Sequence, residues 1–409
     1  MANFNIRVYL KTFDYDGEYD SDFTEITKYV QKIGDISIDT DSSDYQIGVF
    51  RTSNLKLVLN NREGLFGDVG TSETLFVFRR SNSIIRITYE YADDGPWCGV
   101  AEVNEEYLSE EVEIFRGLLN DDSFIQNAKD ELVDFIVLGY ESIFSTTQTP
   151  YSSLSNGDTV AAAIFTCLNQ AEITDYLTID LANINPGEDQ AIDDVSFFEN
   201  STVKEALDQL LNDSNSILRI VDSVVYVSDR APEASVSFHF YGQSSQDGVE
   251  NVSDVSKISN GFNRTFNFIA WEESSLSVSD ASSVAANGLK KLEISSDLFT
   301  DSAKRGNILN NILAEFSEPK REFELTTPFN YGSLDVELLD RVDINYPTIL
   351  IPWENFPFPV CGTAICGDSD SVLPRGLWSL TISTDDNFKV IKKTMKLEKQ
   401  EITFKMRQI

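Results

Sequence analysis

The feature that most limits how this chain can fold is a short alternation of apolar and polar residues that recurs from end to end. Residues 6–11 alternate Ile, Val and Leu with polar side chains, and residues 402–407 repeat the pattern near the C-terminus. A period of two puts alternate side chains on opposite faces of a strand, one buried and one solvated. Turn-forming runs such as residues 60–64 separate these segments. The pattern predicts a mainly β protein whose short strands form barrels or sandwiches.

One central segment departs from the alternation and predicts an α+β part. Thr202 and Glu205 have the spacing of a capping box, which opens a helix at this point. The helix leads into residues 217–227, which read as a β-hairpin with Asp222 and Ser223 at its turn. We therefore expect helices and a hairpin to form a small module between regions of β-structure.

A chain of 409 residues is too long for one ordinary core, so we expect several domains. We place an N-terminal β-barrel-like domain at residues 1–150 and the small α/β module at residues 151–232. A second β-barrel-like domain follows at residues 233–409. It contains a helix at residues 301–316, predicted by an apolar stripe, and an irregular proline-rich insertion at residues 347–377.

The charge of the chain excludes some functions. Asp and Glu number 67 and Lys and Arg 32, which gives a formal net charge of −35. A protein that wraps nucleic acid or coats an anionic membrane needs a cationic face, which such a composition disfavours. Two readings stay open: the acids serve solubility or a salty medium, or they line a surface that nucleic acid passes without sticking. No run reaches the roughly 18 apolar residues of a membrane-spanning helix.

The residue types that usually carry catalysis are scarce. The only histidine, His239, lies in an alternating segment, so we expect a structural role on a strand. No phosphate loop, dinucleotide fingerprint or nucleophile elbow occurs. Acidic pairs are so common that none is singled out as a glycosidase site. We expect no catalytic residue, no cofactor and no enzymatic activity.

Two motifs resemble metal or redox sites. Acids between Asp14 and Glu25 fall at EF-hand positions, but Tyr19 stands where the loop needs glycine, so a turn with solvated acids is expected. The cysteines are too few for a zinc site and no metal is expected. Cys361 and Cys366 form either a local disulfide or two free thiols. The remaining cysteines are Cys98 and Cys167.

Two regions are candidates for contact with partner proteins. In the insertion, Trp353, Phe356 and Phe358 lie among prolines, which suits either docking to a partner or packing on their own domain. Residues 389–409 hold seven basic and two acidic side chains, among them Lys405 and Arg407. This reversal of charge fits either a contact with an acidic neighbour or a solvated strand face. Elsewhere we expect no patch in which Lys or Arg alternates with aromatic residues.

Several segments, in this order, resemble parts of bacteriophage baseplate and tail hub proteins. They are residues 53–66, residues 114–119, the capped helix and hairpin of residues 202–227, the Asp-x-x-Ser run of residues 280–288, and Leu338 to Ile344. In two places the chain differs from the family pattern. Asn287 replaces a usual tyrosine, and Leu339 stands where a turn glycine usually falls.

The resemblance implies a structural hub of a phage tail baseplate or tip. Such hubs have two barrel domains and form a homotrimer with pseudo-sixfold symmetry, which joins a sixfold tail tube to a threefold spike or fibre. Implied partners are the tube or distal tail ring, the spike or fibre, and the tape-measure protein and DNA that pass through the channel. The protein would be made in the host cytoplasm and end in the virion. Alternatives are the hub of a related injection system, another tail-tip component, or a carbohydrate-binding or carbohydrate-cleaving β-protein.

Overall fold

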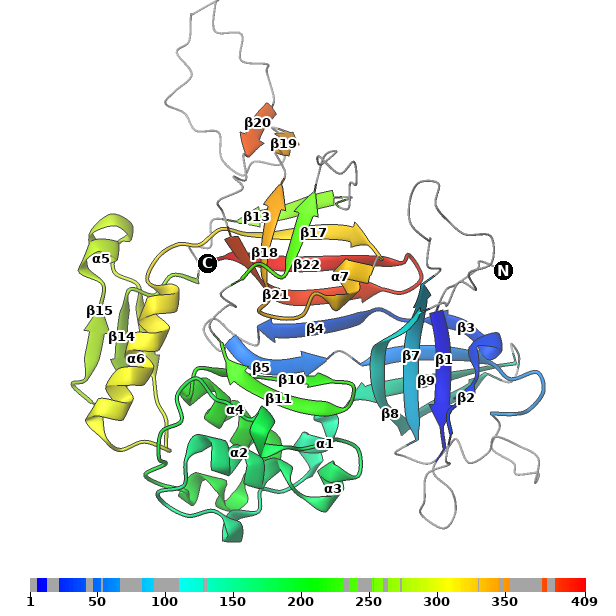
Figure 1. The fold of residues 1–409 in the computed structure, drawn as a ribbon, viewed down its shortest axis with the longest axis horizontal. Helices are drawn as coiled ribbons and strands as arrows, with labels where there is room; N and C mark the ends of the chain where they lie inside the picture. Colours follow the sequence, from blue (N-terminus) through cyan, green and yellow to red (C-terminus); the bar gives the residue numbers. More distant parts are fainter. Residues whose placement is uncertain are drawn as a thin grey trace, which may run out of the picture.

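The chain forms two large β-sheets, a small α/β module and a smaller sheet covered by helices (Figure 1). The computed structural model describes residues 6–12, 22–41, 47–52, 54–66, 83–91, 110–127, 129, 131–230, 235–241, 252, 254–259, 264–272, 274–329, 331–345, 349–352, 377–380 and 387–409. The mainly β fold with α+β parts is confirmed. Within these residues, neither large sheet has a strand order that returns to its first strand.

The N-terminal sheet has seven antiparallel strands in the order β2-β1-β7-β8-β9-β6-β3. Their bounds are β1 Ile6–Lys11, β2 Thr24–Glu25, β3 Val30–Ile33, β6 Leu55–Asn60, β7 Ile84–Tyr91, β8 Glu110–Asn127 and β9 Leu132–Gly139. A short 3-10 turn, η1 (Thr27–Tyr29), precedes β3. Ile6, Val8 and Leu10 are all buried, so the alternation in β1 marks the core face as the sequence predicts.

The central α/β module begins after β9. Its elements are α1 Glu141–Thr146, η3 Tyr151–Ser153, α2 Val160–Leu168, α3 Ala171–Thr174, η4 Leu181–Asn183, η5 Ser196–Asn200, α4 Val203–Asp213, β10 Ser216–Val221 and β11 Val224–Asp229. The predicted capping box is present, since Thr202 caps α4 and the Glu205 side chain accepts from the Thr202 N–H. Asp222 and Ser223 have φ of 48° and 65°, the left-handed pair that closes a two-residue hairpin.

The C-terminal sheet runs in the order β12-β18-β21-β22-β17-β13. Its strands are β12 Phe238–Tyr241, β13 Asp254–Ser259, β17 Glu322–Pro328, β18 Arg341–Asn345, β21 Asn387–Lys396 and β22 Glu401–Gln408, with α7 Tyr331–Asp335 between β17 and β18. β4 (Ile36–Asp41) from the N-terminal region also joins this sheet, because it pairs with β21 and with β5 (Ile47–Thr52). β18 and β4 therefore follow one another along the same edge of β21.

A three-stranded sheet lies beside the α/β module. It consists of β14 (Phe268–Trp271), β15 (Ser277–Ser279) and β16 (Lys291–Ile294). Between β15 and β16 lies α5 (Ala281–Asn287), and α6 (Ser302–Phe316) packs on the sheet (Figure 1). The predicted apolar stripe of α6 faces inward, with Ile308, Leu309, Ile312 and Phe316 buried.

The insertion predicted to be irregular has regular structure at its ends. β19 (Ile349–Pro352) pairs with β20 (Leu377–Leu380) as an antiparallel two-stranded sheet. Main-chain pairing between these two ends was not visible in the sequence, because 24 residues rich in proline and glycine separate them. Those intervening residues lie outside the part of the chain that the structure describes.

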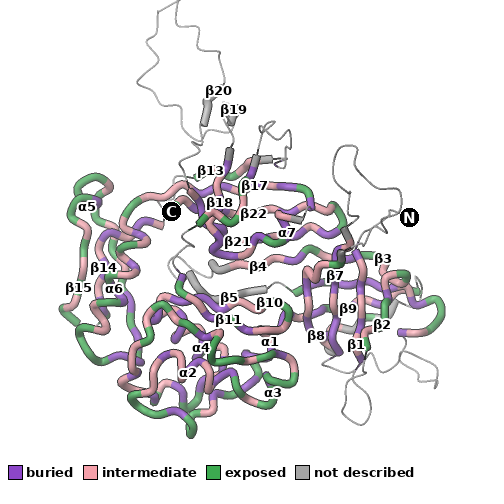
Figure 2. Tube along the Cα trace, in the orientation of Figure 1, coloured by how far each residue is buried: buried purple, intermediate pink, exposed green. Residues whose placement is uncertain are grey.

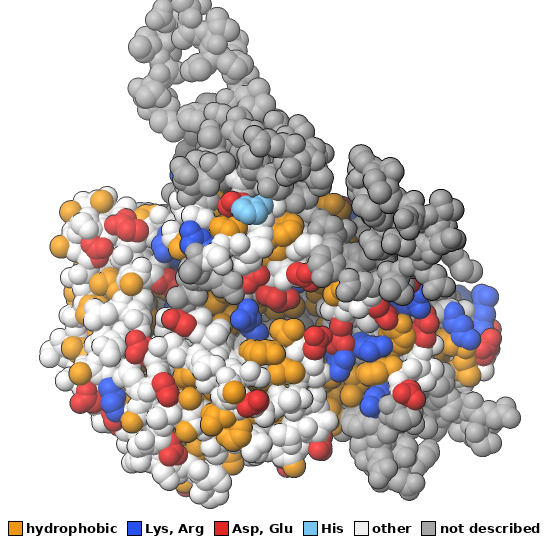
Figure 3. Space-filling model, viewed as in Figure 1, with side chains coloured by type: hydrophobic (Ala, Val, Ile, Leu, Met, Phe, Trp, Pro, Cys, Tyr) orange, Lys and Arg blue, Asp and Glu red, His pale blue; other side chains and the backbone are white. Residues whose placement is uncertain are grey.

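Two hydrophobic cores hold the parts together. Figure 2 shows buried positions in all parts of the fold. One joins the N-terminal sheet to the C-terminal sheet, with Phe135 and Phe404 among its members. The other joins the α/β module to the three-stranded sheet and α6, with Leu210 and Trp271 among its members. Acidic side chains are spread over the visible face of the molecule, as the composition predicts (Figure 3).

The backbone at Leu339 adopts a conformation that is unusual for leucine. Leu339 has a φ of 68° and a buried side chain. A positive φ favours glycine because it has no Cβ to clash with the backbone. The turn before β18 therefore keeps the left-handed geometry of a glycine turn while using leucine to fill the core.

Candidate functional site

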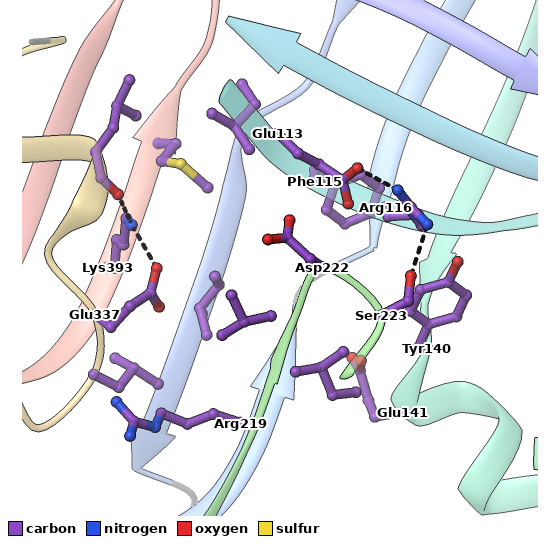
Figure 4. Close-up of a pocket in the computed structure, with 17 residues that line it drawn as sticks. Glu113, Phe115, Arg116, Tyr140, Glu141, Arg219, Asp222, Ser223, Glu337 and Lys393 are labelled. Carbon is purple, nitrogen blue, oxygen red and sulfur yellow. Dashed lines mark hydrogen bonds and ion pairs between the residues drawn. The ribbon is translucent and has the colours of Figure 1, made fainter. Parts of the chain in front are cut away.

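A cavity of about 130 Å³ lies where the N-terminal sheet, the α/β module and the C-terminal sheet meet (Figure 4). β8 forms one side, and β4, β21 and the turn after α7 form the other. The tip of the β10–β11 hairpin lies between the two sides, with Asp222 pointing into the space. Its charged lining residues are Glu113, Arg116, Glu141, Arg219, Asp222, Glu337 and Lys393.

Arg116 links β8 to the hairpin tip. Its guanidinium forms an ion pair with Glu113, and its Nη1 donates to Ser223 Oγ at 2.7 Å. Burial raises the pKa of Glu113, although the hydrogen bond from Arg116 opposes that shift. Burial likewise raises the pKa of Tyr140 to about 12, so its phenol stays protonated. The polar contact fixes the hairpin against the N-terminal sheet.

On the other side of the cavity, Lys393 makes polar contacts within the C-terminal part, between β21 and the segment around α7. It lies in β21 and is only 3% exposed. Its ammonium donates to the Leu334 carbonyl at 2.7 Å and forms an ion pair with Glu337 at 3.3 Å. Paired and hydrogen-bonded charges of this kind avoid the desolvation cost of an isolated buried ion and favour one arrangement of the parts. Of the two sets of contacts at the cavity, the one from Arg116 to Ser223 connects separate parts of the fold.

A second group of buried charges ties α6 to both neighbouring parts. Glu315 in α6 forms ion pairs with Arg230, just after β11, and with Lys389 in β21. Burial alone would raise the pKa of Glu315, but Arg230 and Lys389 outweigh it and hold that pKa well below its usual range. Burial lowers the pKa of Lys389 to about 8. A negative charge on α6 therefore joins two cations from different sheets.

The basic residues of the last two strands meet acids of their own chain. Lys405 lies 3.5 Å from the Glu322 carboxylate, and Arg407 lies 3.9 Å from it. Arg407 is 1% exposed and its guanidinium covers the Phe316 ring at 4.5 Å. The basic residues at 389–409 suggested contact with an acidic neighbour. Glu322 of the same chain provides part of that acidic partner. A role of Lys405 and Arg407 in contacting another protein stays a prediction.

The other predicted contact residues, Trp353, Phe356 and Phe358, lie outside the described residues. So do Cys98, Cys361, Cys366 and most of the acidic string from Asp14 to Glu25. Cys167 is a buried free cysteine, and burial raises its pKa to about 12. In the described part of the chain, no cluster of His, Cys, Asp or Glu is suited to a metal ion. No helix described here is long and apolar enough to cross a membrane.

His239 lies on strand β12, as the alternation predicts. Its Nδ1 lies 2.6 Å from an Asp343 carboxylate oxygen on the paired strand β18. The imidazole is 54% exposed. The contact joins two parallel strands and lies outside the set of residues that line the central cavity.

Sequence reasoning missed the residues that line the cavity and one basic–aromatic cluster. Arg86 lies 4.6 Å from the centre of the Tyr9 ring and 4.5 Å from that of Phe23, a cluster that the fold assembles from separate segments. These residues come from separate segments, and spacing along the chain gives no sign of their meeting. The one signal was that Arg86 alternates with Ile85 and Ile87, which assigns it to the polar face of its strand.

Comparison with known proteins gives a likeness in structure only. No family model and no curated protein matches the sequence. Three solved structures are similar over nearly their whole length. The 43 kDa tail protein of prophage MuSo2 from Shewanella oneidensis is 10% identical with a TM-score of 0.52, covering 98% of this chain and 96% of its own. The tail protein from Neisseria meningitidis MC58 is 9% identical with a TM-score of 0.55, covering 99% and 96%.

The third is prophage tail protein gp18 from Listeria monocytogenes EGD-e. It is 10% identical with a TM-score of 0.50, and the match covers 98% of this chain and 94% of that one. Identity this low shows a common fold. The chain therefore has the fold of these phage tail proteins from its N-terminal sheet to its last strand.

Proposed function

We propose that this protein is a structural, non-enzymatic component of a phage tail, and that it ends in the virion. The observation that carries the proposal is the end-to-end likeness to three tail proteins, each matched over 94% or more of its own length. A match across all parts supports a common role better than a match to one widespread domain would. The polar joints between the sheets and the module suit a rigid component of an assembly.

Within the tail, we assign the chain to the hub of the baseplate or tip. It would form a ring-like homotrimer between the sixfold tube or distal tail ring and a threefold spike or fibre. The domain division at residues 1–150, 151–232 and 233–409 belongs to the same proposal. The first and last domains of three subunits would together provide six similar units, which match the sixfold symmetry of the tail tube. Trp353, Phe356, Phe358, Lys405 and Arg407 remain the proposed partner contacts.

The net charge of −35 suits a conduit for DNA and tape-measure protein. Acids on a channel wall repel the phosphates of DNA, so the genome passes without binding. In a cryo-electron microscopy map of the assembled ring, we expect Asp and Glu to outnumber Lys and Arg on the inner wall. A wall lined mainly by Lys and Arg would refute the conduit argument.

The oligomeric state of the full-length protein tests the hub assignment. Size-exclusion chromatography with light scattering should give a mass of three chains, and negative-stain images should show rings. Gold-labelled antibody against the protein should mark the tail tip of phage particles. A monomer that releases sugars from bacterial polysaccharide would instead support the carbohydrate-active alternative and end the hub proposal. Labelling elsewhere on the tail would keep the tail role and discard the hub.

A further inference from the structure

Arg86 is the centre of a cluster of cations and aromatic rings on the N-terminal sheet. Its guanidinium carbon lies 4.6 Å from the centre of the Tyr9 ring and 4.5 Å from that of Phe23. Tyr9 on β1 and Arg116 on β8 are its partners in register on the two adjacent strands. Arg116 also lies over Phe23, at 5.6 Å. We call Tyr9, Phe23, Arg86 and Arg116 the Arg86 cluster.

Arg86 differs from its neighbours in its pairing. Arg7 forms ion pairs with Glu90 and Glu25, and Arg116 pairs with Glu113. Arg86 has neither an ion pair nor a side-chain hydrogen bond with any residue in the described part of the chain, and its Nε is buried without a partner. Acids outnumber bases 67 to 32 in this sequence, so a shortage of carboxylates does not explain it.

The rings hold this arginine in a form suited to recognition. A guanidinium stacked on aromatic faces keeps its N–H groups in the plane of the fork, where they match the two oxygens of a carboxylate. Stacking also lowers the entropy that would otherwise be lost on binding. Two arginines directly opposite on adjacent strands repel each other, and an added anion would relieve that repulsion.

We propose that the Arg86 cluster is a docking site for a carboxylate side chain on an acidic polypeptide segment of a neighbouring protein subunit. Charge complementarity selects this occupant: an unpaired, pre-oriented arginine binds an acid, and the rings of Tyr9 and Phe23 offer apolar contact to its methylene groups. Lys and Arg side chains lie beside hydrophobic ones on the visible face over the N-terminal sheet (Figure 3). The inference rests on this geometry and not on the tail role.

A polypeptide fits the cluster better than a nucleic acid does. Glu113 and Glu90 lie on the adjoining strands β8 and β7, and the chain as a whole carries −35. A polynucleotide carries a phosphate on every nucleotide, and the negative charge of these glutamates and of the whole chain would repel each phosphate. A polypeptide places one carboxylate against Arg86 with neutral backbone on either side.

Binding of a fluorescent peptide with one glutamate between neutral alanines to the full-length protein tests the proposal. Fluorescence anisotropy at about 20 mM salt limits screening of the charges. We expect binding that the same peptide with glutamine in place of the glutamate does not show, and a Kd at least tenfold higher in Arg86→Gln. Arg86→Lys keeps the charge and loses the fork, so its Kd should rise several-fold. Lys28→Gln is the control, because Lys28 is an exposed cation 4.7 Å from the Tyr29 ring.

Thermal melts of each variant separate loss of binding from loss of folding. If Arg86→Gln does not fold, Arg86→Lys decides the question. Absence of binding of the glutamate peptide by the wild-type protein, or equal binding by wild-type and a folded Arg86 variant, overturns the proposal. Stronger, Arg86-dependent binding of a hexamer of deoxythymidylate also overturns it, in favour of a polyphosphate ligand.

Discussion

Leu339 shows how one residue meets two opposed demands. Its φ of 68° favours glycine, while its place in the core, where it is 5% exposed, favours a large apolar side chain. An L-residue in the left-handed region costs about 1–2 kcal/mol, and burial of a leucine side chain stabilises by about 1.5–3 kcal/mol. Packing therefore outweighs backbone strain at this turn, which accounts for a leucine in a conformation that favours glycine.

This balance predicts that the glycine variant is more stable than the alanine variant at position 339, and that the order is reversed at position 338. At position 339, Leu339→Gly should be more stable than Leu339→Ala by about 1 kcal/mol, because glycine relieves the positive φ. At position 338, where φ is not positive, Leu338→Ala should be more stable than Leu338→Gly by a similar margin. Urea unfolding of the four variants measures both differences. The same order at both positions would show that the strain has no energetic effect.

Asp213 is a second residue whose surroundings control its chemistry. It ends α4, is 2% exposed, and accepts hydrogen bonds from Gln209 and from Ser296, which follows β16. Burial raises its pKa from 3.8 to about 7, and the nearby Asp297 adds to the rise. The folded state therefore binds this proton more tightly than the unfolded state does.

The sign of the resulting pH dependence follows from that difference. The contribution of Asp213 to the free energy of unfolding is greatest below pH 4, falls as the pH rises to about 7, and is level above it. The slope is at most about 1.4 kcal/mol per pH unit. Asp213→Asn can accept the same hydrogen bonds and should remove this slope, giving higher stability than wild type at pH 8. Chemical denaturation between pH 4 and pH 8 measures it.

Asp193 provides the matched comparison. Burial would raise its pKa, but hydrogen bonds from Lys304 and from the N–H groups of Asp301 and Thr300 lower it to about 2. Its stabilisation is present above pH 4 and is lost as the pH falls toward 2. Asp193→Asn should therefore destabilise the protein at neutral pH, opposite in sign to Asp213→Asn. Equal effects of the two substitutions would contradict this account.

Among the elements, helix α6 depends most on a single charge. Glu315 binds cations from two other elements, Arg230 and Lys389, both nearly fully buried. Removal of one partner from a buried ion pair leaves the other charge uncompensated, at a cost of about 3–5 kcal/mol. We expect Glu315→Gln to destabilise the protein by an amount in this range, measured by urea unfolding.

Two further variants isolate the cause. Glu318→Gln makes the same change at an exposed position after α6 and should have little effect. When Glu315→Gln is combined with Lys389→Met, Lys389 is no longer left as a buried cation without its anionic partner. The double variant should therefore lose less stability than the sum of the losses in the two single variants. Strict additivity would show that Glu315 and Lys389 act independently.

Elements with local signals could be predicted from the sequence. The capping box at Thr202, the turn at Asp222 and Ser223 and the apolar stripe of α6 each lie within a few residues, so spacing alone reveals them. Contacts between distant segments could not be predicted this way. Arg86 meets Phe23, and Glu315 meets Lys389, only because the fold brings segments that are distant in the sequence together. The central cavity was missed for the same reason.

At the scale of the whole molecule, the first and last parts of the chain complete one another. Ser37 and Thr394 are 357 positions apart, yet their hydroxyl oxygens lie 3.2 Å from each other across the β4–β21 pair. We expect a fragment of residues 235–409 to aggregate when expressed alone, because half of one edge of β21 is then uncovered. Co-expression with residues 1–230 should restore a soluble complex. A soluble fragment with a cooperative melt would contradict this expectation.

The pairing of β4 with β21 also affects how the protein folds as it is made. β4 leaves the ribosome long before its partner strand, because Ser37 and Thr394 are 357 positions apart. Contacts so far apart in sequence form slowly, and the unpaired strand must be kept from other chains until then. A chain that ends early cannot make the pair. The β4–β21 pair therefore forms only in chains that have been translated past β21, and a chain truncated before that strand leaves β4 without this partner.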